Sequence, residues 1–497
     1  GERGNRDWRN GTSRGRLHRG KAILAYVAVP ELAVAEPAPP GRADSPMSAP
    51  VEIHDPYAAL KVRTYRDYMI GSFLATIGRQ AVSVAVSWEI YQWTKSATAL
   101  GLVGLILVLP LLALSLPAGS LADRLDRKRI IAWGTGLTAL LSALLALLSH
   151  FHAVIPPLAP LRWANALIQR LATVFERHTD PATLNFDQPA LPLMYLLLLG
   201  IAVVRILAWP ARSSIIPLLL PARALPNAIT WNMSAFEVAT VTGPALGGFI
   251  IAFGGFQAVY VLDVVLGLGF LWLLRHVRYH VAPPPPAGPR TWRSMLAGVE
   301  FIWRRKVILG ASSLDLFATL LGGVMALLPI YADQVLHVGP IGLGWLRAAP
   351  SLGAFTMAMW LAHRAPLARP GLTLLWSIAG FGLAIVVFGW SHWYWLSFIA
   401  LLFTGVFDSV SVIVRQSLVQ LLTPDHLRGR VTSVNQIFIG SSNEIGALRA
   451  GLMGALVGPV AAVVWGGLGT LLVAGIVASA VPGLRRLAPL HTLKPDP

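Results

Sequence analysis

The stretch RSSIIPLLLP at residues 212–221 returns as RQSLVQLLTP at residues 415–424, displaced by 203 positions. At a displacement of 240, the run from Gly104 to Arg124, with Pro110 and LADR, matches the run from Gly344 to Arg364, with Pro350 and LAHR. The displacement of 203 also relates further pairs, which are Asn232 and Asn435, Gly243 and Gly446, and Gly248 and Gly451. Two constant displacements indicate two related halves in parallel order, with about 37 more residues in the first half.

The composition decides in which solvent these halves fold. Of the 497 residues, 55% are hydrophobic and 13% are charged, which is roughly half the charged fraction of a soluble domain. A set of soluble domains is therefore excluded, and the chain is expected to be an all-α membrane protein. It contains no cysteine, which excludes disulfide scaffolds and thiolate sites. The histidines form no pattern that predicts a metal site.

Apolar runs of about 20 residues, long enough to cross a bilayer as helices, recur from Tyr68 onward. They predict twelve spans, at residues 69–92, 98–121, 130–150, 192–219, 226–253, 257–275, 307–331, 341–362, 370–390, 394–421, 431–456 and 459–481. With the N-terminus inside, the inner loops and the C-terminal tail hold nineteen Lys and Arg and the outer loops hold four. This asymmetry predicts that both termini are cytoplasmic and accounts for most of the net charge of +17 without a nucleic-acid partner.

These observations predict the following organisation. Residues 1–66 form a basic, largely disordered cytoplasmic tail, of which 1–46 either belong to the tail or lie upstream of a true start at Met47. Residues 67–275 form a six-helix bundle, 276–306 a cytoplasmic linker with four consecutive prolines, 307–484 a second six-helix bundle, and 485–497 a tail.

The extra residues of the first half lie in an outer loop, 151–190. Apolar residues within it recur at helical spacing, which predicts a short amphipathic helix. The helix either lies on the outer membrane surface or caps the outer ends of the spans.

The loop between the second and third spans reads GSLADRLDRKR at residues 119–129. It resembles the loop signature of the major facilitator superfamily, and this resemblance implies two pseudo-symmetric six-helix bundles that alternate in access around a central site. Asp126 stands where the signature has Gly, and His363 replaces Asp123 in the second-half copy.

The loop is expected to act as a latch that closes the inner side. Gly119 allows close helix approach, and Asp123 can face the positive N-terminus of a helix in the other half. The cations can engage helix C-termini or lipid phosphates; they are Arg124, Arg127 and Lys128. The alternative, a plain cytoplasmic basic loop, explains the cations but not Gly119 and Asp123 at this spacing.

Further stretches resemble the bacterial exporters related to the enterobactin exporter. They are RILAWPARSSIIP at 205–217, LRAAP at 346–350, RGRV at 428–431 and SNEIG at 442–446. The resemblance covers about residues 60–485 and implies efflux of siderophores or other small hydrophobic molecules across the inner membrane.

GPALGG at residues 243–248 is similar to a GPxxGG element of the superfamily's antiporters, with Gly243, Pro244, Gly247 and Gly248 at its fixed positions. The proline bends the helix and the glycines permit tight packing. Ordinary small-residue packing is the alternative.

Ionisable residues within membrane spans are functional candidates because an uncompensated charge there is costly. Near span centres stand Arg79, Arg205, Glu237, Asp408 and Glu444, whereas Asp315, Arg347 and Asp263 lie nearer span ends. In the fold implied by the resemblance, spans 1, 4, 7 and 10 line the cavity, which favours Arg79, Arg205, Asp315 and Asp408. Glu237 and Glu444 are rival proton carriers, with Glu444 on a helix that is usually peripheral. Glu89, near the outer end of its span, is expected to be solvated.

The displacement of 203 places Arg205 on Asp408, which predicts that the two approach one another across the cavity axis. Such a pair would act either as a proton-coupling switch or as a static lock between the halves. Arg212 and Arg415 also coincide, and we expect them to reach inner headgroups or to form the inner gate.

The sequence therefore predicts a secondary transporter, and not an enzyme, in the bacterial inner membrane. It is expected to export a small hydrophobic or siderophore-like molecule by proton-driven antiport, to need no cofactor, and to work as a monomer in the lipid bilayer. An importer or a non-transporting sensor on the same fold is the alternative. A polytopic membrane enzyme is less favoured because no catalytic constellation is evident.

Overall fold

The computed structural model describes residues 55–179, 183–279, 299–364, 368–485, 487 and 489. Most of the predicted tail, part of the predicted linker and the C-terminus lie outside this part of the chain. The first described residues already pack on the bundle, since the Ala59 N–H donates to Asn227 and the Pro56 carbonyl accepts from Trp231. The ordered fold therefore begins before the predicted boundary at residue 66.

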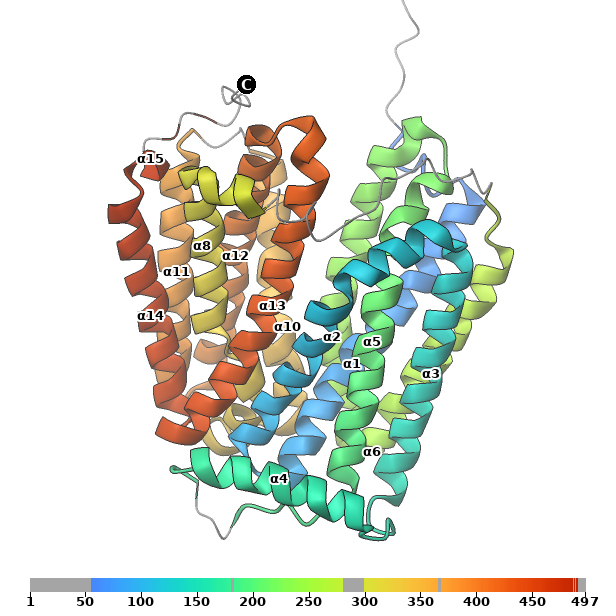
Figure 1. Cartoon of the computed structure of the whole chain (residues 1–497), viewed down its shortest axis with the longest axis vertical. Coiled ribbons are helices and arrows are strands. Elements are labelled where there is room, and N and C mark those ends of the chain that lie inside the picture. The colour runs from blue at the N-terminus through green and yellow to red at the C-terminus, as the bar shows by residue number, and fades with distance from the viewer. Residues whose placement is uncertain are drawn as a thin grey trace, which may run out of the picture. The chain divides into compact units, whose positions relative to one another are not determined.

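Long helices account for nearly all of the described chain (Figure 1). The first half contains α1 (Arg63–Thr94), α2 (Ala97–Arg124), α3 (Arg127–Phe151), α4 (Ala159–Phe175), α5 (Ala190–Ile215) and α6 (Leu225–His276). The second half contains α8 (Lys306–Gly322), α9 (Leu328–Ile330), α10 (Gly339–Ala362), α11 (Pro370–Trp390), α12 (Tyr394–Leu422), α13 (Asp425–Val457), α14 (Pro459–Ala480) and the short α15 (Pro482–Arg485). A π-helical turn, Tyr331–Val335, continues α9.

Each predicted span coincides with helix over most of its length. The ranges 226–253 and 257–275 both lie in α6, which is interrupted at Gly255, where φ is 75° and ψ is −178°. Among the described residues, nine segments are long and apolar enough to cross a membrane, and Ala222–His276 is one of them. Helices α10 and α13 are not among the nine, so twelve crossings remain a prediction.

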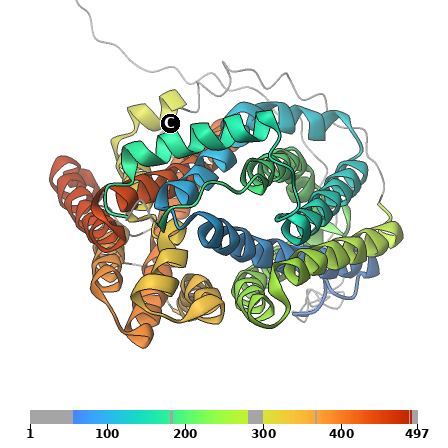
Figure 2. The same ribbon diagram turned by 90° about the horizontal axis from the view of Figure 1, so that it is seen from below.

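Two pairs of helices join the halves (Figures 1 and 2). Helix α2 runs along α13, and α6 runs along α10. The sequence displacements map α2 onto α10 and the first part of α6 onto α13, so the two contacts are equivalent. The structure thus has the internal symmetry that the repeated sequence indicates.

The hydrophobic core shows at which end the halves meet. One continuous cluster of buried residues contains members of both halves, including Tyr91, Leu100, Leu327 and Leu343. Toward the other end of the helices the described core divides into separate clusters. One lies within the first half, around Tyr65 and Phe270, and two lie within the second half. The halves therefore share a core at the end where α4 lies, which is the predicted outer end, and have separate cores at the predicted inner end.

Candidate functional site

A group of arginines lies on the inner half of the first bundle. Arg79 of α1 donates to the Thr76 hydroxyl at 2.7 Å and has Arg205, Arg212 and Asp263 as charged neighbours. The Arg212 guanidinium donates to Thr135 at 3.2 Å and lies 5.7 Å from the Phe270 ring centroid. The buried Asp263 accepts a hydrogen bond from Ser142 at 2.6 Å. Three arginines and one aspartate therefore form this side of the site, which we call the cationic wall.

On the second bundle, Asp315, Asp408 and the cation Arg415 form the other side of the site, which we call the acidic wall. Asp315 of α8 and Arg415 of α12 form an ion pair at 2.7 Å, with side chains only 5% and 2% exposed. Asp408, half-buried on α12, has Asp315, Arg415 and Glu237 as charged neighbours, and Glu237 comes from α6 of the first half. Among the described residues, no cation lies within ion-pair distance of Asp408.

One ion pair joins the two walls. The guanidinium of Arg205, on α5, lies 3.6 Å from the carboxylate of Glu444, on α13, with side chains 45% and 22% exposed. The predicted approach of Arg205 to Asp408 is therefore wrong, and so is the view of Glu444 as peripheral. Residues related by the repeat are equivalent in position, which does not bring them into contact.

The helical face that carries Arg205 shows where the site opens. Along α5 this face is buried at Met194, Leu198 and Ala202. It becomes exposed at Arg205 and at Trp209, whose exposed fraction is 59%. Because these residues recur at three- and four-residue spacing, the same side of the helix passes from packed to open. The exposed part of this face lies toward the predicted cytoplasmic end.

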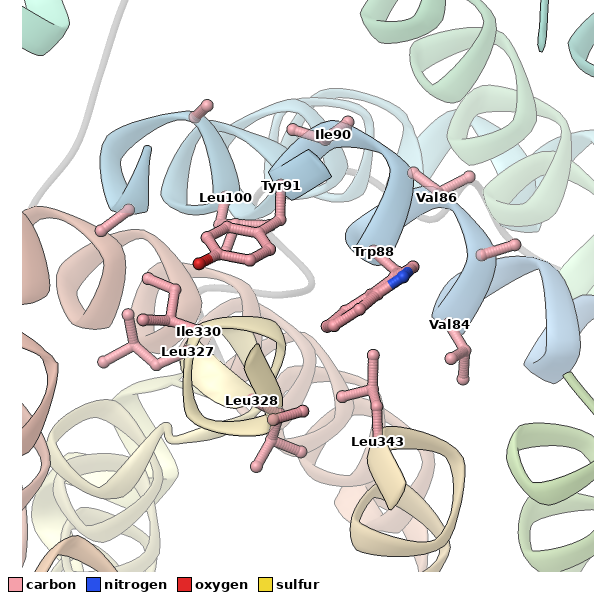
Figure 3. Close-up of a cluster of buried hydrophobic side chains, with 14 of the residues drawn as sticks. Val84, Val86, Trp88, Ile90, Tyr91, Leu100, Leu327, Leu328, Ile330 and Leu343 are labelled. Atoms are coloured by element: carbon pink, nitrogen blue, oxygen red, sulfur yellow. The ribbon is translucent and has the colours of Figure 1, made fainter. Parts of the chain in front are cut away.

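Apolar side chains close the outer end (Figure 3). Tyr91 of α1 lies against Leu327 and Ile330, and Trp88 is directed toward Leu343 of the second half. Polar contacts lie beside this apolar cluster, because Asp333 accepts from the Tyr91 hydroxyl at 2.9 Å and from Lys95 at 3.0 Å.

A second polar contact joins the halves deeper in the membrane. Arg347 of α10 donates to the Ser87 hydroxyl at 2.7 Å and to the Ser83 carbonyl at 3.1 Å, both on α1. The apolar cluster and these contacts close the predicted outer end, whereas the cores of the two halves are separate at the predicted inner end.

The predicted GPxxGG element lies where three helices meet. A Cβ on Gly247 would lie 2.9 Å from Cα of Ala81 on α1. A Cβ on Gly248 would lie 2.3 Å from the Pro340 carbonyl oxygen and 3.0 Å from Cα of Gly344, on α10. The element therefore packs on α1 of its own bundle through Gly247 and on α10 of the other bundle through Gly248.

The equivalent position on α13 makes an equivalent contact. A Cβ on Gly451 would lie 2.4 Å from Cα of Gly101 on α2. Small residues thus permit the close approach of the halves at both crossings.

The loop after α2 binds helix ends, as predicted for its cations. Arg127 lies 3.4 Å from the Ser214 carbonyl near the end of α5, and the Lys128 ammonium donates to the Val277 carbonyl after α6 at 2.7 Å. Gly119 is buried and Arg124 is exposed. The Asp123 side chain lies outside the described residues, so the latch itself stays a prediction.

Asp126, the departure from the signature, is the N-cap of α3. Its carboxylate accepts from the Arg129 N–H at 3.1 Å and from the Tyr279 hydroxyl at 2.9 Å. Burial alone would raise the pKa of Asp126. The hydrogen bonds from Arg129, Tyr279 and Lys128 stabilise its charged form, however, and hold the pKa below its ordinary value of 3.8. An aspartate here caps the helix, which a glycine cannot do with a side chain.

Several expectations require correction. Arg415 is buried beside Asp315 and does not extend to headgroups, and Arg212 is held by Thr135 within its own half. An inner-gate role for either residue remains a prediction.

Glu89 is fully buried and not solvated. It accepts hydrogen bonds from Ser149 and, at 2.6 Å, from Tyr260. Its place near a span end suggested solvent, but the outer ends of α1, α3 and α6 pack together there.

The amphipathic helix in the outer loop has properties of both alternatives. Asn165 and Ala172 are buried against the bundle, whereas Trp163 is 71% exposed and Val174 is 61% exposed. Helix α4 therefore caps the outer ends with one face and keeps a second apolar face free to lie at the membrane surface.

Sequence reasoning missed Arg347, Lys95 and Asp333 as contacts between the halves. For Arg347 a signal existed, because it stands inside the LRAAP stretch that resembles the exporters. Lys95 and Asp333 lie in predicted outer connections far apart in the sequence, and nothing in the sequence pairs them.

Comparison with known proteins agrees with this architecture. The chain is 27% identical over 424 residues to the enterobactin exporter EntS of Shigella boydii serotype 18, and 28% identical to that of Escherichia coli O81. Both alignments cover 85% of this chain and 92% of the relative.

Among solved structures, the chain resembles an inward-facing, occupied bacterial homologue of the human lysosomal transporter Spinster. The TM-score is 0.60 at 14% identity, covering 87% of this chain and 99% of that one. It also resembles the peptide transporter POT, with a TM-score of 0.61 at 14% identity, covering 85% and 95%. These likenesses show the fold alone.

The family model of the Major Facilitator Superfamily matches residues 68–447. The two symmetric helix crossings and the charged site between the halves agree with this match. The chain therefore belongs to the major facilitator superfamily and is a multi-pass membrane transporter.

Proposed function

We propose that this transporter exports a small amphipathic, siderophore-like molecule across the bacterial inner membrane in exchange for protons. The observation that carries the proposal is the division of charge across the inner opening. The first bundle contributes Arg79, Arg205 and Arg212, and the second contributes carboxylates, among them Asp408 without an ion-pair partner in the described chain. Likeness to EntS over most of both chains supports the direction of transport.

The cationic wall suits an anionic or strongly polar group of the cargo. Arg205 is the most accessible of the three, and its partner Glu444 is 3.6 Å away, a loose contact that a bound anion can replace. The exposed Trp209 lies one turn further along α5 and offers an aromatic surface for an apolar part of the cargo. A cargo with both an anionic group and an apolar part would contact both Arg205 and Trp209.

The acidic wall offers the proton site. Asp315 is already compensated by Arg415 at 2.7 Å, so its charge is fixed by that pair. Asp408 is half-buried beside Asp315 and Glu237, and we propose that it takes up and releases the coupled proton. The driving force is then the proton gradient, and no cofactor is required.

We propose that both termini face the cytoplasm and that a single chain transports by alternating access, without a nucleic-acid partner. The excess of Lys and Arg in the predicted inner loops supports this orientation.

The test begins with the cargo. Metabolites in the spent medium of cells with and without the protein are compared, and a compound that accumulates only with the protein is the substrate. Export lowers its intracellular level, whereas an importer would raise it.

The coupling step is then tested with that compound in everted membrane vesicles. We expect Asp408→Asn to abolish uptake driven by a proton gradient while substrate–substrate exchange continues. Asp187→Asn, on an exposed outer loop, is the matched control and should behave like the native protein. Full proton-driven uptake by Asp408→Asn would refute the assignment of the proton site.

A further inference from the structure

The outer insertion of the first half has no counterpart in the second. Between α3 and α5 the chain forms α4 and then turns at Glu176, whereas α11 and α12 are joined by little more than Ser391–Trp393. Figure 1 shows α4 lying across the outer ends of the bundle. The segment that follows α4 contacts one helix of each half.

Its first attachment is to the N-terminus of α2. The Glu176 carboxylate accepts from the Ser96 hydroxyl at 2.6 Å and from the Thr98 N–H at 3.0 Å. Ser96 is itself the N-cap of α2, accepting from the Ala99 N–H. A carboxylate at this place satisfies a free donor of the first turn and is favoured by the helix dipole. Glu176 is only 7% exposed, so the contact is protected from water.

Its second attachment is to the C-terminus of α13, in the other half. The N–H groups of Arg177 and His178 both donate to the Ala455 carbonyl, at 3.1 and 3.3 Å. This carbonyl lies in the last turn of α13, where no following helical N–H is available. The His178 ring also packs against Gly458, the C-cap. Three consecutive residues therefore bind helix ends that belong to different halves.

Helices α2 and α13 are the antiparallel pair that crosses at Gly101 and Gly451. Their outer ends must part if the outer side of the protein is to open. We infer that residues 176–178 are a strap that stabilises the outer-closed state by binding both helix ends at once. On the opposite side of the molecule α6 and α10 meet directly, at Gly248 and Pro340. The strap therefore acts on one of the two crossings and makes opening asymmetric.

The strap links α2 to α13 only while both of its attachments are intact. Weakening either attachment therefore lowers the free energy needed to open the outer side. Glu176→Ala removes the attachment to α2 and leaves the backbone contacts with Ala455. The variant loses hydrogen bonds to a charged group, and the strap is then held only by its backbone contacts with Ala455. We therefore expect the ratio of outer-open to outer-closed molecules to rise roughly five- to hundredfold. Glu176→Gln keeps the length of the side chain and should produce a smaller rise.

The populations can be measured on the purified protein by spin labelling. Because the chain contains no cysteine, labels attach only to introduced thiols. Val154→Cys with His392→Cys reports on the outer ends of the two halves, and Leu125→Cys with His363→Cys reports on the inner ends, all at exposed positions. Distances are read by double electron–electron resonance. Gln169→Ala, exposed on α4, is the matched control.

We expect longer outer distances and shorter inner distances in Glu176→Ala than in the native protein and in Gln169→Ala. If Glu176→Ala does not fold, Glu176→Gln decides the question with the same labels. Distance distributions unchanged in a folded Glu176 variant would overturn the strap. The measurement needs no substrate, so it is independent of the proposed export.

Discussion

At the scale of single residues, the ion pairs of this protein differ in how much water they meet. Arg415 and Asp315 are almost completely buried at 2.7 Å, whereas Arg205 and Glu444 are partly exposed at 3.6 Å. Removing one partner of a buried pair leaves an uncompensated charge. An exposed pair contributes little to stability. The first pair is therefore a fixed part of the second bundle, and the second can break during transport.

This difference predicts unequal costs for two similar substitutions. Arg415→Met should destabilise the folded protein by about 3–5 kcal/mol, whereas Glu444→Gln should cost no more than about 1 kcal/mol. The free energies are compared through the melting temperatures of the purified proteins in one detergent. Equal losses of stability would show that the buried pair is not the stronger support of the fold.

Single residues are also where the sequence was least informative about partners. The charged residues within spans could be identified, because a charge in an apolar run is conspicuous. Their partners could not, because the repeat relates equivalent positions and contact depends on how helices cross. Arg205 and Asp408 are equivalent, yet Arg205 meets Glu444. Glu89 shows the same limit, since its burial depends on Ser149 and Tyr260 of two other helices.

At the scale of elements, the positions of the helices could be predicted almost completely. Apolar runs of spanning length left few alternatives, and helix covers most of each of the twelve ranges. The insertion was harder, because an amphipathic pattern identifies a two-sided helix but not what each side meets. Helix α4 buries Asn165 and Ala172 and exposes Trp163, a combination that periodicity alone does not specify.

The close crossing of α6 and α10 predicts unequal effects on stability for two glycine-to-alanine substitutions. Gly248→Ala places a methyl group 2.3 Å from the Pro340 carbonyl oxygen, so backbone must move, at a cost of about 1–3 kcal/mol for overpacking. Gly475→Ala is the matched control, because nothing lies within 4 Å of its Cβ position. Alanine there should stabilise the helix by up to about 1 kcal/mol.

Both glycine variants are assessed by thermal unfolding and by transport. We expect Gly248→Ala to lose stability and transport together, and Gly475→Ala to lose neither. Equal melting temperatures for the two variants would mean that the approach of α6 to α10 is less close than described.

At the scale of the whole molecule, the architecture could be predicted from the repeat, but the conformational state could not. The same sequence must adopt outer-open and inner-open forms if it alternates in access, and composition does not select between them. The state is visible only in the packing. The core is shared by both halves at the outer end and is divided at the inner end.

The open end can be checked with a membrane-impermeant maleimide in everted vesicles, where the cytoplasmic side faces the reagent. Trp209 is 59% exposed and Trp88 is 5% exposed. We expect the thiol of Trp209→Cys to react about tenfold faster or more, since a packed position reacts only after local opening. Equal rates, or faster reaction of Trp88→Cys, would contradict an inner-open site.

The two glycine crossings have a mechanical consequence. Gly101 with Gly451 and Gly248 with Gly344 are places where the backbones of the two halves approach closely, so a line through them is a plausible axis of rotation between the halves. The inner end of α6 at Leu225 lies about 35 Å from Gly248 along the helix. A rotation of about 10° about this axis therefore moves that end by about 6 Å. Both crossings lie near the predicted outer ends of their helices, so the same rotation moves the outer ends by a smaller distance than the inner ends.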